Sequence, residues 1–90
     1  MSTILYHSGI DYFKNSNMVY HTIMNKFKEK LKELREESKL LQKQLSAELG
    51  VSQVTIARWE TGNREPDFDI LIKIAKYFKV TTDYLLGLED

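Results

Sequence analysis

A three-residue break between two short helical segments constrains the fold of this chain more than any other feature. Residues 42–49 and 53–61 both place apolar side chains at helical spacing, and only three residues separate them. Gly50 is expected to end the first helix and Gly62 the second, because glycine adopts the left-handed conformation at a helix end with the least strain. The hydroxyl of Ser52 is expected to cap the second helix by accepting an amide hydrogen from its first turn. Two helices joined in this way must pack against each other.

A long helix is predicted before this pair, over about residues 18–37, with Asn17 as its N-cap. Apolar residues at steps of three or four carry this prediction: Tyr20, Ile23, Phe27, Leu31 and Leu34. Met24 could equally be the start of a compact domain. The chain therefore divides into an N-terminal extension, 1–23, and a helical domain, 24–90. The extension is expected to be partly helical or irregular, or to lengthen the first helix.

The first 17 residues have few charges and scattered apolar side chains without a sustained period. Ser8 and Asp11 have the spacing of a capping box, which predicts a short helical turn around residues 10–14. Five tyrosine and phenylalanine residues occur from Tyr6 through Phe27, both included, a composition that can bury surface and that disfavours a disordered tail. These aromatic side chains would pack on the bundle or extend a dimer.

Two further helices are predicted after the pair. Asp67 is expected to cap a helix that runs to about Phe78, and Thr81 or Thr82 to start a last short helix that Gly87 ends. The inward residues of the first of these would be Ile70, Leu71, Ile74 and Phe78. No segment alternates between apolar and polar residues as a strand would. The predicted fold class is all-α.

Composition narrows the class of protein. Ninety residues fit one small domain, and no apolar run approaches the roughly 20 residues that cross a bilayer. The chain has no cysteine, which suits a reducing cytoplasm and excludes disulfides and thiolate metal sites. Thirteen basic and 13 acidic residues cancel, which counts mildly against a nucleic-acid partner. The distribution of these charges therefore matters more than their sum.

Two helices joined by a three- or four-residue turn with a glycine form a helix-turn-helix, whose second helix enters the DNA major groove. Ser46 is a small residue where the helices would cross, and Val54, Ile56 and Trp59 are assigned to the side of the second helix that faces inward. The opposite, exposed face would present Gln53, Thr55, Ala57 and Arg58. A solvated helix face would explain these residues taken alone, but the surrounding turn and caps favour contact with DNA.

Residues from about Met24 to Asp90 resemble the Cro and phage-repressor type of helix-turn-helix domain, also called the xenobiotic-response-element family. The resemblance rests on LKELRE at 31–36, LQKQLSAELGVSQVTIARWETGNREP at 41–66 and VTTDYLLG at 80–87. It implies a five-helix bundle that binds operator DNA, commonly as a dimer, and represses transcription. Its members act on double-stranded DNA.

The resemblance also implies roles for single residues. Gln42 would contact a phosphate and brace Gln53, whose amide suits bidentate contact with adenine. The implied base contacts are Gln53, Val54, Thr55 and Arg58. The implied phosphate contacts are Gln42, Ser52, Thr61, Asn63 and Arg64. Phosphate contacts fix the register, while base contacts discriminate sequences by roughly 1–3 kcal/mol each.

Four positions depart from the family pattern. Leu41 stands where a capping serine or threonine is usual, Thr61 replaces a common asparagine, and Asn63 replaces a common lysine. Glu65 adds a negative charge beside the DNA backbone. With few phosphates neutralised, the salt dependence should be modest, at about −0.9 per contact. Moderate affinity that depends on two half-sites is expected.

The last short helix is the candidate dimer interface, through Tyr84, Leu85 and Leu86. One or two of these side chains must close the core, and any that remain exposed would form a two-fold contact. Half-sites would then lie about one helical turn, 34–36 Å, apart. A homodimer is the expected assembly.

Two rival functions use the same bundle. An antitoxin would bind a toxin through the N-terminal segment, and an exposed apolar patch over residues 4–13 would favour it. A protein-interaction module, with a partner such as an anti-repressor, would be favoured by acidic residues around Gln53 and Arg58. An enzyme is the remotest reading, because no nucleophile and base can be paired from spacing.

No metal, cofactor or membrane partner is predicted. His7 and His21 have no companion ligands at metal spacing, and a helix cap and a first-turn acid explain Asp67 and Asp69. The expected protein is a cytoplasmic transcriptional regulator.

Overall fold

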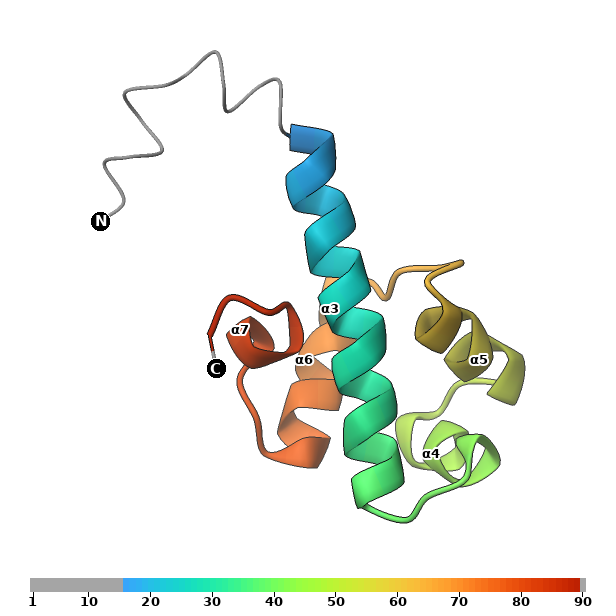
Figure 1. Cartoon of the computed structure of the whole chain (residues 1–90). Helices are drawn as coiled ribbons and strands as arrows, with labels where there is room; N and C mark the ends of the chain where they lie inside the picture. The colour runs from blue at the N-terminus through green and yellow to red at the C-terminus, as the bar shows by residue number, and fades with distance from the viewer. Residues whose placement is uncertain (1–15, 90) are drawn as a thin grey trace.

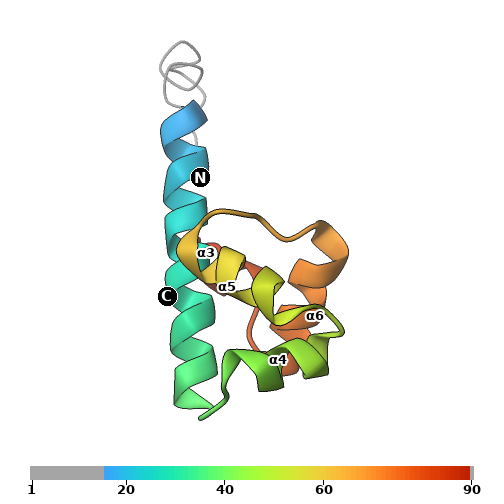
Figure 2. The same cartoon turned by 90° about the vertical axis from the view of Figure 1, so that its right-hand side faces the viewer.

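The computed structural model describes residues 16–89 and contains, over that range, five helices and no strand. They are α3 (Ser16–Glu37), α4 (Gln42–Leu49), α5 (Gln53–Thr61), α6 (Phe68–Phe78) and α7 (Thr82–Leu85). In Figure 1 the long helix α3 runs between α4 and α5 on the right and α6 and α7 on the left, and the turned view of Figure 2 shows that α4, α5 and α6 all pack on one side of α3. The predicted all-α bundle is confirmed.

Most helix ends lie where the local residues predict them. Gly50 and Gly62 take the left-handed conformation, with φ of 72° and 80°, after α4 and α5. The Oγ atom of Ser52 accepts the amide hydrogen of Thr55 at 3.1 Å, and a carboxylate oxygen of Asp67 accepts that of Ile70 at 2.9 Å. Gly50 ends α4 and Ser52 begins α5, so these two residues set the length of the turn between the two helices.

Helix α3 begins earlier than expected. It starts at Ser16, so Asn17 lies inside the first turn and is not the N-cap. Residues 15–17 are asparagine, serine and asparagine, all good N-cap types, which is why residue type alone did not locate the first helical residue. The helix continues without a break through Met24. The turn predicted around residues 10–14 lies outside the described residues.

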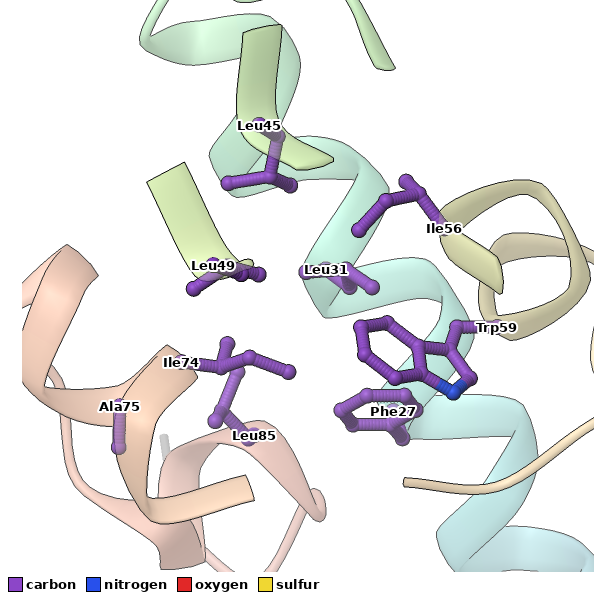
Figure 3. Packing of buried hydrophobic residues seen from close by; sticks show 9 residues of the cluster. All are labelled: Phe27, Leu31, Leu45, Leu49, Ile56, Trp59, Ile74, Ala75 and Leu85. Carbon is purple, nitrogen blue, oxygen red and sulfur yellow. The ribbon is translucent and has the colours of Figure 1, made fainter. Parts of the chain in front are cut away.

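One cluster of buried side chains joins all five helices (Figure 3). Its members are Phe27, Leu31, Leu45, Leu49, Ile56, Trp59, Ile74, Ala75 and Leu85. Partly buried side chains surround it, including the predicted inward residues Ile70, Leu71 and Phe78. Leu85 is 0% exposed and is one of the side chains that closes the core, which leaves Tyr84 and Leu86 as the candidates for a two-fold contact. Tyr84 and Leu86 are only partly buried.

The described part of the chain includes no helix that is both long enough and apolar enough to span a bilayer.

Candidate nucleic-acid interface

The close approach of α4 and α5 depends on a small buried residue. Ser46 is 7% exposed, and its hydroxyl donates to the carbonyl oxygen of Lys43 at 2.7 Å, so its one polar group is satisfied within α4. On α5, Ile56 and Trp59 face the core. Both helices are therefore held by their inner faces, and the outer face of α5 is left free.

The exposed stripe of α5 differs in one respect from the expected face. Val54 is 58% exposed and lies at helical spacing with Arg58 and Thr61, which are exposed as well. Its assignment beside Ile56 and Trp59 was wrong, because a residue two positions before an inward residue points well away from it on a helix. Its role as a candidate base contact is compatible with this exposure.

Gln53 and Thr55 flank this stripe. Gln53 is exposed at the first turn of α5. Thr55 is only half exposed, and its hydroxyl lies 2.9 Å from that of Ser52, which also accepts the Thr55 amide hydrogen. The structure therefore makes Thr55 part of the helix cap, with a smaller exposed surface than Gln53 has.

The candidate phosphate contacts at the far end of α5 are exposed and linked to one another. The Thr61 hydroxyl lies within donating distance of the carbonyl oxygens of Ala57 and Arg58, at 3.0 and 3.2 Å. Asn63 Nδ2 donates to the same hydroxyl oxygen at 3.1 Å. The Thr61 hydroxyl thus donates its hydrogen within the helix, while Asn63 and Arg64 present their side chains to solvent.

Gln42 has a different partner from the expected one. Its Nε2 atom donates to Oε1 of Glu60 at 3.1 Å, so in this structure it braces Glu60 and not Gln53. A carboxylate is a stronger acceptor than an amide oxygen, which favours this arrangement. Gln42 is half buried at the first turn of α4, and its link ties α4 directly to α5.

An ion pair that the sequence analysis missed lies beneath this link. Arg35 donates from Nε and Nη2 to the two oxygens of Glu60, at 2.7 and 3.0 Å, and from Nη1 to the carbonyl oxygen of Leu40 at 2.8 Å. The Arg35 and Glu60 side chains are 11% and 3% exposed. The hydrogen bond to Glu60 raises the pKa of Arg35 above its ordinary value, against the opposing effect of burial.

The sequence contains a signal from which the Arg35–Glu60 pair could have been predicted. Glu60 lies four residues after Ile56, on the inner face of α5, and a carboxylate at such a position needs a partner. Arg35 belongs to the LKELRE segment and is the only arginine before α5. The triad of Arg35, Glu60 and Gln42 joins α3, α4 and α5, and so fixes how the exposed stripe of α5 is presented.

The N-terminus of α4 has only one of the two hydrogen bonds of a capping box. Leu41 occupies the N-cap position and its side chain accepts no hydrogen bond, as predicted. The side chain of Gln44 compensates in part, because its Oε1 atom accepts the Leu41 amide hydrogen at 2.8 Å. This is the reciprocal half of a capping box without the serine or threonine half.

Two helices joined by a tight glycine-containing turn, with an exposed stripe on the second, define a helix-turn-helix protein. A family model described as helix-turn-helix matches residues 31–85, more than half of the chain. The chain belongs to this family, in its Cro and phage-repressor type.

Individual relatives agree with this class. The chain is similar to the HTH-type transcriptional activator BcrR of Enterococcus faecalis, 44% identical over 64 residues, which are 71% of this chain and 31% of that protein. It is similar to the uncharacterized HTH-type transcriptional regulator MJ0272 of Methanocaldococcus jannaschii, 40% identical over 63 residues, 70% of this chain and 96% of that protein. It is 34% identical over 58 residues to Repressor protein C2 of Salmonella phage P22, 64% of this chain and 27% of that protein.

The chain thus spans about a third of the activator BcrR and less of the phage repressor. Both an activator and a repressor are among the relatives, so similarity alone assigns no direction of regulation.

Proposed function

We propose that this protein is a repressor that binds an inverted-repeat operator as a dimer, reading DNA with α5. The observation that carries the proposal is the exposed stripe of Val54, Arg58 and Thr61, flanked by Gln53. The Arg35–Glu60 pair holds this helix from below. The repressor role follows the resemblance to the phage-repressor type; one phage repressor and one activator are among the similar proteins. The protein would act in the cytoplasm, where its operator is accessible.

The proposed roles follow the chemistry of each side chain. Gln53 suits bidentate contact with adenine, Arg58 suits guanine or a phosphate, and Val54 offers an apolar contact for a thymine methyl group. Thr55 would contribute from the edge of this surface. Ser52 and Gln42 lie at the starts of the two motif helices, and Thr61, Asn63 and Arg64 at the far end of α5, where phosphates on either side of the groove would pass.

The proposed dimer places two such helices on one face of the duplex. Tyr84 and Leu86 remain as interface candidates beside the buried Leu85. The Tyr84 ring already packs under the ammonium group of Lys30, at 4.6 Å from the ring centroid, which fixes its orientation. A two-fold contact there would give half-sites about one helical turn apart.

In vitro selection from random duplex DNA at low salt tests this proposal. We expect the enriched sites to be inverted repeats with half-site centres about one turn, 34–36 Å, apart. Gln53→Ala should relax the preference at one position in each half-site, by about 1–3 kcal/mol of discrimination, while Arg64→Ala weakens all sequences alike. If folded protein enriches no sequence, or if both variants lose affinity and specificity in the same proportion, the proposal is wrong.

A second candidate function, binding of a protein partner, is favoured by exposed apolar side chains. Phe68 is 83% exposed, and Val19, Tyr20 and Leu88 are exposed too. A toxin or an anti-repressor is the kind of partner that would cover such side chains. The patch over residues 4–13 that would mark an antitoxin lies outside the described residues. The only acidic residue of α5 is the inward-facing Glu60, so crowding of acidic groups around Gln53 and Arg58 does not come from this helix.

A further inference from the structure

The N-terminal half of α3 lies against the loop that follows α5. Tyr20, Met24 and Lys28 recur every four residues, so they share one face of α3. All three precede residue 31, where the match to the family begins. Figure 2 shows the loop leaving α5 beside α3 and arching across to the start of α6.

Three observations show that this face follows the loop. The Lys28 side chain lies so near Gly62 that a Cβ atom there would be 3.3 Å from Lys28 Cδ. Met24 and Pro66 line one apolar groove with Phe68. The Tyr20 hydroxyl donates to Oε2 of Glu65 at 2.5 Å, across 45 positions of sequence. This hydrogen bond raises the pKa of the Tyr20 phenol above its ordinary value.

Apart from the Tyr20 bond, the loop after α5 is held only at its two ends by the hydrogen bonds found among the described residues. Its start is held by the bond from the Asn63 amide to the Arg58 carbonyl oxygen, at 2.9 Å, and its end by the Asp67 cap. Among the described residues, the bond from Tyr20 is the one side-chain link between Glu65 and another element. Asn63 and Arg64, the candidate phosphate contacts, lie between these anchors.

We propose that Tyr20 is a positioning residue for DNA binding, which acts through Glu65 to hold the loop of Asn63 and Arg64 in the conformation that meets phosphates. The inference rests on the proposed function. A loop ordered in advance costs less conformational entropy when it binds. The Glu65 carboxylate, when it is hydrogen-bonded to Tyr20, is also less free to pair with the neighbouring Arg64. It then competes less with a phosphate for the Arg64 guanidinium group.

The test compares two hydroxyl deletions, Tyr20→Phe and the control Tyr77→Phe, an exposed tyrosine of α6. Operator affinity would be measured by fluorescence anisotropy on the selected site. We expect Tyr20→Phe to weaken binding about threefold to tenfold, as for one lost hydrogen bond, and Tyr77→Phe to leave it unchanged. In an Arg64→Ala, Asn63→Ala background, Tyr20→Phe should cause no further loss, because the residues it positions are gone. A residue needed only for general stability would weaken binding in both backgrounds.

A second readout does not involve DNA. The ¹⁵N heteronuclear NOE of the amides of residues 63–65 should fall in Tyr20→Phe and in Glu65→Ala, and should not fall in Tyr77→Phe. Unchanged loop dynamics in Tyr20→Phe, or binding by it that equals that of Tyr77→Phe, would overturn the inference while leaving operator binding intact. If the wild-type protein selects no operator, the proposed function fails and this role in DNA binding fails with it.

Discussion

At the scale of single residues, the buried pair of Arg35 and Glu60 has the largest consequences for this molecule. The carboxylate is 3% exposed, and its three hydrogen bonds come from Arg35 and Gln42. A buried charge with all of its partners is tolerated, whereas one that loses a partner is strongly destabilising. The orientation of α5 therefore depends on the Arg35–Glu60 pair, whose two side chains are largely buried.

Arg35→Ala should lower the free energy of unfolding by about 3–5 kcal/mol, because it leaves the Glu60 carboxylate buried without its cation. Urea unfolding followed by circular dichroism measures this loss. Arg64→Ala, at an exposed position, is the matched control and should change stability by less than about 0.5 kcal/mol. Equal effects of the two substitutions would show that the ion pair contributes nothing specific.

The contact between Arg35 and Glu60 also determines how its contribution to stability changes with pH. The pKa of Arg35 is raised in the folded protein above its ordinary value, so its stabilising contribution is complete at any pH below that ordinary value and is lost only as the pH rises above it. The guanidinium contribution is therefore constant across the neutral range.

At the scale of the elements, the caps decide where each helix begins and ends. Ser52, Asp67 and Thr81 each accept an amide hydrogen from three residues further along the chain. Helix α4 is the exception, because Leu41 offers no acceptor at the same position. Two lysines, Lys39 and Lys79, take left-handed conformations at helix ends, with φ of 58° and 59°, where glycine would be less strained.

Leu41→Ser should stabilise the protein by about 0.5–2 kcal/mol. Its backbone already has the extended geometry of an N-cap, with φ of −77° and ψ of 157°, and Gln44 already accepts its amide hydrogen. Serine would complete the capping box, and little apolar burial is lost because Leu41 is 67% exposed. Thermal unfolding of Leu41→Ser beside Leu41→Ala tests this, since alanine removes the same side chain without adding an acceptor. Equal melting temperatures for the two variants would show that the missing N-cap of α4 does not limit the stability of the protein.

At the scale of the whole molecule, a net charge of zero limits long-range attraction to DNA. Affinity would then come from short-range contacts, made together at the two half-sites of the proposed operator. The phosphate contacts proposed for each subunit are few, and the Thr61 hydroxyl is already engaged within α5.

The salt dependence of operator binding measures how many phosphates are neutralised. We expect the slope of log K against log salt to fall in magnitude by about 0.9 for each half-site in Arg64→Ala. Arg64→Lys, which keeps the charge, should leave the slope nearly unchanged. A slope that Arg64→Ala does not alter would place this residue away from the DNA backbone.

The predictable features of this protein are those that act over a few residues. Gly50, Ser52, Gly62 and Asp67 interact with their own helices within five positions, so their residue types were sufficient to locate four helix ends. The start of α3 was missed because three good N-cap types follow one another at residues 15–17. Val54 was assigned to the wrong face although helix geometry contained the answer.

The sequence by itself thus determined the helices, the turn between α4 and α5, and most of the core, because periodicity and capping are local properties. Only the tertiary structure decided that Gln42 and Arg35 meet Glu60, and that Tyr20 meets Glu65, across 18, 25 and 45 positions. The physical reason is that the possible partners of a polar side chain come within its reach only when the helices pack. Packing of the five helices selects among them, and that selection places the surface proposed to bind DNA.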